Sequence, residues 1–63
     1  MSENQIIEKL TTVETMLKDT YARQAAWKDM FGKEMPANTW TMQLQSFLLR
    51  KQAQLEQSFA LAV

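Results

Sequence analysis

A single short stretch, Gly32 to Asn38, constrains the fold of this chain more than any other part of it. It holds the only glycine and the only proline among the 63 residues, Gly32 and Pro36. Glycine commonly ends a helix, proline often follows a helix end, and Asn38 or Thr39 can cap the next helix. Long runs with helical spacing and no helix breaker lie on both sides. The sequence therefore predicts an all-α, two-helix antiparallel hairpin.

The hairpin is expected to form one domain, residues 1–63, with a helix over about 3–31, a turn over 32–38 and a helix over about 39–61. Ser2 and Gln5 match a capping box at the start of the first helix. Thr11 and Glu14 match a second one, which would allow an earlier break, but the apolar spacing keeps its phase there and favours one continuous helix.

Along the first helix, apolar residues recur at intervals of four, three and four, which is the spacing of a helix buried on one side. These residues are Ile6, Leu10, Val13 and Leu17. Beyond Leu17 this stripe weakens, and its continuation passes through Thr20 or Tyr21 and then Gln24. The second helix carries one apolar stripe and a further strip of Met42, Leu49, Ala53 and Ala60, so that more than half of its circumference is apolar. One partner helix cannot cover so wide a surface.

Self-association is therefore predicted, into a four-helix bundle or a larger helical oligomer, because a chain this short is marginally stable alone. The predicted self-association residues are Ile6, Leu10, Val13, Leu17, Leu44, Phe47, Leu48, Leu55 and Phe59.

Composition argues against several classes of function. The chain has no cysteine and no histidine, which removes disulfides and the usual zinc ligands, and one glycine cannot build a phosphate-binding loop. We expect no catalytic residue, no cofactor and no metal. Seven basic residues balance seven acidic ones, which argues against nucleic-acid binding, and no apolar run is long enough for a membrane span. With no signal-peptide pattern at the N-terminus, a cytoplasmic location is the default.

Aromatic and methionine side chains gather in sequence around the bend, and two interpretations are open. They can plug the end of a bundle, since methionine fills irregular gaps, or they can form a docking face for a larger protein. The residues considered for partner binding are Tyr21, Trp27, Met30, Phe31, Met35, Trp40 and Met42.

The second helix also contains many glutamines, among them Gln43, Gln45 and Gln52, which we expect on an outer face. At the C-terminus, the last residues resemble the small apolar tails by which bacterial proteases select substrates. The alternative is that Phe59 and Leu61 complete the second helix and pack near the start of the first.

In size and outline the expected hairpin resembles the plasmid copy-number regulator Rop, an all-helical hairpin that dimerises. That resemblance is architectural and transfers no residue. Short neutral helical chains of this kind also occur among phage and bacterial accessory proteins. The function expected first is a non-enzymatic interaction module: an adaptor, co-chaperone or inhibitor of a larger protein. The alternatives are a Rop-like nucleic-acid-binding regulator and a small-ligand binder at a subunit interface.

Overall fold

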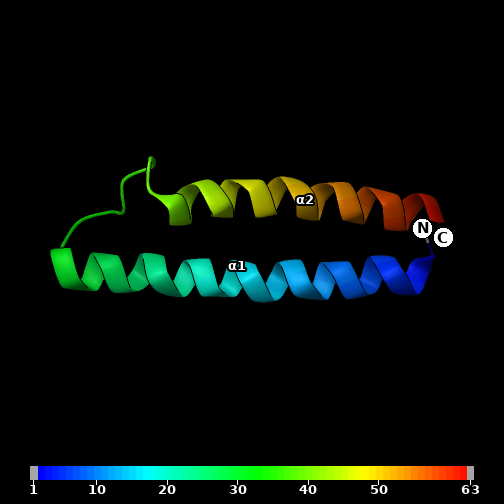
Figure 1. Cartoon of the computed structure of the whole chain (residues 1–63), viewed down its shortest axis with the longest axis horizontal. Helices are drawn as coiled ribbons and strands as arrows, with labels where there is room; N and C mark the ends of the chain where they lie inside the picture. Colours follow the sequence, from blue (N-terminus) through cyan, green and yellow to red (C-terminus); the bar gives the residue numbers. More distant parts are fainter. Residues whose placement is uncertain (1, 63) are drawn as a thin grey trace.

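The protein is a hairpin of two antiparallel α-helices, as a computed structural model describing residues 2–62 shows. Helix α1 runs from Glu3 to Phe31 and helix α2 from Trp40 to Ala62. The helices lie side by side along a molecule of 45 × 17 × 14 Å, with the start of α1 and the end of α2 at the same end (Figure 1). The predicted all-α hairpin is confirmed.

The first helix begins at the predicted capping box. The Ser2 hydroxyl accepts a hydrogen bond from the Gln5 backbone N–H, and the Gln5 side chain accepts one from the Ser2 N–H. Two of the backbone donors that a helix start leaves without a partner are thereby satisfied. The helix then continues unbroken past Thr11 and Thr12, whose hydroxyls donate to carbonyls one turn earlier. The second capping box is not used.

The bend forms where the glycine and proline indicate. Gly32 adopts the left-handed conformation, with φ of 68°, and its N–H donates to the Lys28 carbonyl at 2.7 Å. The Thr39 hydroxyl accepts from the Met42 N–H at 3.3 Å, so Thr39 rather than Asn38 caps α2. Thr39 also donates its hydroxyl to the Pro36 carbonyl at 2.9 Å, which ties the end of the turn to its middle.

The core is a single seam between the two helices. Its fully buried apolar residues come from both helices, and three partly buried side chains pack against them. The buried members are Ile6, Val13, Leu17, Leu48 and Leu55, and the partly buried ones are Leu10, Leu44 and Phe59. A seam has no enclosed interior, because each helix meets only one neighbour.

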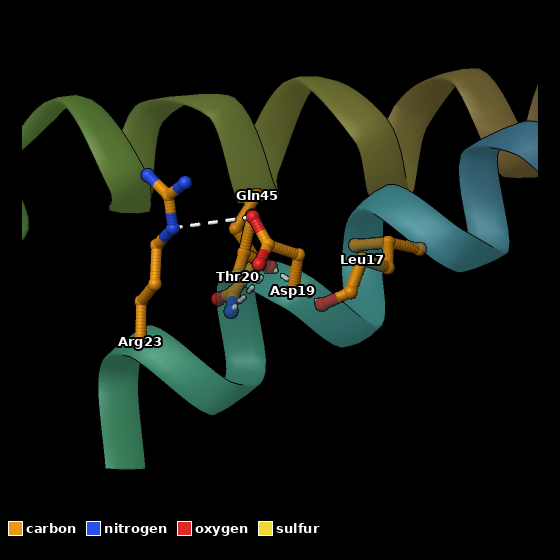
Figure 2. Close-up of polar contacts among 5 residues, drawn as sticks. All are labelled: Leu17, Asp19, Thr20, Arg23 and Gln45. Atoms are coloured by element: carbon orange, nitrogen blue, oxygen red, sulfur yellow. Dashed lines mark hydrogen bonds and ion pairs between the residues drawn. The ribbon is translucent and has the colours of Figure 1, made fainter. Parts of the chain in front are cut away.

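Toward the bend the seam becomes polar. Gln45 of α2 is buried and donates from Nε2 to the Gln24 Oε1 at 3.0 Å. It also donates, more weakly, to the Thr20 Oγ1 at 3.4 Å (Figure 2). Thr20, which is 1% exposed, donates its own hydroxyl to the Leu17 carbonyl at 2.7 Å. The weakened stripe thus continues through Thr20 and Gln24, while Tyr21 lies exposed.

Two expectations were wrong at the level of single residues. Gln45 does not lie on an outer face; it is buried because it stands three residues before Leu48, on the side of α2 that meets α1. Leu61 does not pack near the start of α1 but is 82% exposed, whereas Phe59 packs against the core as expected. The last residue, Val63, lies outside the described residues.

Candidate interaction surfaces

The bend end of the molecule presents large apolar side chains to solvent. Helix α1 extends past the first turn of α2, so that its last turns lie beside the connecting segment and not beside a helix (Figure 1). Met30 is 74% exposed, Phe31 53% and, at the start of α2, Trp40 66%. We call these three residues, together with Trp27, the bend-end surface.

Trp27 forms the inner part of this surface. Its ring lies 4.5 Å from that of Phe31, centroid to centroid, at an angle of 47°, an arrangement that favours aromatic contact. The Trp27 indole N–H is shielded from solvent and has no acceptor among residues 2–62. A buried donor without an acceptor costs free energy. The aromatic pair is therefore held by packing and not by a hydrogen bond.

An ion pair fastens the connecting segment next to this surface. The Lys28 ammonium lies 2.9 Å from the Glu34 carboxylate, across the helix end at Gly32. Both side chains are largely exposed, so the pair contributes little free energy, but it links the turn to the last turn of α1.

The structure brings only some of the predicted partner-binding residues together. Met35 is buried in the turn and Met42 is half-buried, so neither offers much surface. Tyr21 is 47% exposed but lies six residues before Trp27, which places it on a different side of α1. Met35 is thus buried whereas Met30 is exposed, and both interpretations of the bend residues stay predictions.

The residues predicted for self-association lie mostly inside the single hairpin. Eight of the nine are the members of the core seam already described, and the ninth, Phe47, is 54% exposed. These eight residues pack between the two helices of one chain. Whether they also take part in self-association stays a prediction.

The two broad sides of the hairpin differ in character. One, the Tyr21 face, has an open groove of about 250 Å³ along the seam, to which both helices contribute. It is lined by Glu14, Leu17, Lys18, Tyr21 and Gln52. The other, the Phe47 face, has an open groove of about 380 Å³ between the same helices. It is lined by Glu8, Lys9, Thr12, Val13, Lys51 and Leu55, and Phe47 lies one turn before Lys51.

The two grooves share an open form. Each is open to solvent, and within residues 2–62 no three carboxylates gather where they could hold a metal ion. The expectations of no enzyme activity, cofactor or metal remain predictions. Neither α1 nor α2, over the part that the structure describes, is long and apolar enough to cross a membrane.

Comparison with protein-family models, with curated proteins and with solved structures finds no match to this chain.

Proposed function

We propose that this protein is a small non-enzymatic interaction module that self-associates through apolar helix faces and docks onto a larger protein through its bend-end surface. The role is that of an adaptor, co-chaperone or inhibitor. The cytoplasmic location expected from the sequence is part of the proposal.

The observation that carries the proposal is the exposure of Met30, Phe31 and Trp40 at one end of the molecule. Tryptophan and other aromatics, with methionine, are enriched in the cores of protein interfaces relative to the rest of the surface. Full burial of one such side chain contributes about 1.5–3 kcal/mol, so three of them at one end of the molecule can anchor a partner.

Their position in the fold also suits docking. The surface lies past the end of the helix seam, so a partner can reach it without separating α1 from α2. The Trp27–Phe31 pair orders its base before binding. A surface ordered in advance loses less conformational entropy when it binds.

Affinity capture from extracts of the source organism, with quantitative mass spectrometry, tests the docking. The baits are the wild type, Trp40→Ser and a matched control, Gln54→Ser, which is exposed in the middle of α2. We expect a protein retained by the wild type and by Gln54→Ser but lost with Trp40→Ser, and purified candidates should shift the tryptophan fluorescence to shorter wavelength. Equal retention by all three baits would contradict docking through the bend end.

Mass measurement by light scattering over a range of concentrations tests self-association separately. The proposal expects a mass of at least twice the 7.3 kDa of one chain. A monomer at every concentration would refute that half of the proposal and leave the capture experiment to decide the other.

A further inference from the structure

Helix α1 carries a strip of exposed residues along the Tyr21 face that its own hairpin does not cover. Ile7, Glu14, Lys18, Tyr21 and Ala25 follow one another at intervals of seven, four, three and four, which places them on one side of the helix. Ile7 is 45% exposed and Tyr21 47%. The strip is thus apolar at both ends and charged in the middle.

Helix α2 contributes a matching strip to the same face. Leu49, 43% exposed, lies one turn before Gln52, which lines the groove of this face together with Tyr21. Ala53 and Ala60 follow Leu49 on the same side of the helix. Small side chains at these positions leave room for another helix to approach closely.

The two charges in the middle of the α1 strip form no ion pair within residues 2–62. Glu14 and Lys18 have the i,i+4 spacing that favours a pair, yet the ion pairs in this part of the chain join Asp19 to Arg23 at 3.1 Å and Lys28 to Glu34. Glu14 and Lys18 therefore stand as a negative and a positive group about one helical turn apart, either side of position 16.

Position 16 is also close to the midpoint of α1, which runs from Glu3 to Phe31. Two copies can be related by a two-fold axis that lies between them and crosses α1 at position 16, perpendicular to the helices. Positions 14 and 18 are equally distant from this axis. It would therefore place Glu14 of each chain opposite Lys18 of the other. The same axis would place Ile7 opposite Ala25, a large side chain opposite a small one.

Gln45 stands against Thr20 and Gln24, so the axis passes α2 near position 51, the midpoint of this helix. It would place Leu49 opposite Ala53 of the other copy, again a large side chain opposite a small one.

We infer that a second copy of this chain covers the Tyr21 face, related by this two-fold axis and held by two reciprocal Glu14–Lys18 ion pairs. The inference rests on the proposed self-association and specifies its face and register. An axis at the midpoint overlaps the two hairpins along their full length. One side of the hairpin measures 45 × 17 Å, and its area is comparable with the roughly 800 Å² that each partner buries in a standard interface.

Among the charged residues of α1, only Glu14 and Lys18 are opposite in sign and equally distant from position 16, and they lie on the Tyr21 face. On the Phe47 face, Lys9 and Arg23 lie fourteen residues apart on the same side of α1, and both are equally distant from position 16. A corresponding axis on that side would bring Lys9 of each copy against Arg23 of the other, and Arg23 is already paired with Asp19 at 3.1 Å, so the Phe47 face offers no reciprocal ion pair. The Phe47 face therefore stays uncovered in this dimer.

Charge reversal tests the inference, with dimer dissociation constants measured by analytical ultracentrifugation at low salt. Glu14→Lys alone would set two ammonium groups against each other at both pairs of the dimer, and Lys18→Glu alone would set two carboxylates against each other there. Each variant should therefore dimerise about tenfold more weakly or worse. In an equimolar mixture of the two variants, the heterodimer sets the ammonium groups of one chain opposite the carboxylates of the other at both pairs. Association should therefore recover in the mixture.

The decisive sample is the double variant Glu14→Lys/Lys18→Glu. It restores an opposite charge at both reciprocal pairs, and its dimer should recover an affinity near that of the wild type. Because the double variant also keeps the net charge of the wild type, its recovery distinguishes a specific pairing from a general effect of charge.

Two controls separate this effect from simple loss of helix or change of net charge. Glu8→Lys makes the same charge change at the groove of the Phe47 face and should leave dimerisation unchanged. Far-UV circular dichroism reports helix content, which should be equal in the wild type and in each of the variants under the conditions of the measurement.

A wild-type dimer that both single variants leave intact would overturn the inference while self-association stands. Weakening of both single variants without recovery in the double variant would overturn the reciprocal pairing in the same way. A wild-type monomer at every concentration would overturn the proposed self-association itself, and the inference with it.

Discussion

The buried amide of Gln45 offers the sharpest test of how this hairpin is held together. It is 8% exposed, and its Nε2 donates to Gln24 of α1 at 3.0 Å and to Thr20 at 3.4 Å. Gln45→Ala removes one buried methylene, worth about 0.8 kcal/mol, and one well-formed hydrogen bond, worth about 1 kcal/mol. With the weaker bond and the space left behind, we expect a loss of about 2–3 kcal/mol in the free energy of unfolding.

That loss is large for a chain of this size, whose total stability is expected to be roughly 3–9 kcal/mol. The assay is urea denaturation followed by circular dichroism, at a fixed protein concentration because association adds to apparent stability. Gln43→Ala is the matched control, since Gln43 is exposed on the same helix, and its effect should stay within about 0.5 kcal/mol.

A double-mutant cycle then isolates the bond between the two amides. Gln24→Ala, Gln45→Ala and the double variant should give a coupling energy of about 0.5–1.5 kcal/mol. A coupling indistinguishable from zero, or a loss for Gln45→Ala no larger than that for Gln43→Ala, would refute the view that this polar contact joins the helices.

Three further outcomes are expected from denaturation measurements on single variants. Leu48→Ala, at a position 3% exposed, should cost about 2–5 kcal/mol, and a loss below about 1 kcal/mol would contradict its place in the core. Gly32→Ala should cost about 1–2 kcal/mol through backbone strain alone, because φ is 68° and the added Cβ meets no atom within 4 Å. Gly32→Asn should cost less, because asparagine tolerates the left-handed conformation better than alanine does. Equal losses for the two variants would argue against a left-handed residue at this position. Glu34→Gln should change the free energy of unfolding by less than about 1 kcal/mol, since both side chains of its ion pair with Lys28 are exposed. The change should be smaller still at high salt. A larger loss would show that the pair holds the turn.

The helix ends were predictable because their causes are local. Ser2, Gly32 and Thr39 act within three or four residues of themselves, through capping bonds and a single backbone conformation. The burial of Ile6, Val13 and the other seam residues was likewise predictable, because their spacing in the sequence follows the helical period.

The polar end of the seam was harder to predict, because it depends on which residues of the two helices stand opposite each other. The interval of three to Leu48 places Gln45, and not Gln43, on the buried side of α2. Its partners Gln24 and Thr20, however, follow only once α2 is set against α1 in one register. The exposure of Leu61 has the same origin: it follows from where α2 ends relative to α1, and a helical pattern alone does not contain that information.

The sequence by itself thus determined two helices, the bend between them and an excess of apolar surface, since each depends on interactions between near neighbours in the chain. The tertiary structure alone decided which side chains share the seam and which remain outside. Register places Gln45 beside Gln24 and leaves Trp40, Met30 and Phe31 beyond the end of the seam. It also sets Tyr21 and Gln52 along one groove, because contacts between distant residues follow from how two helices pack and not from the pattern of either one.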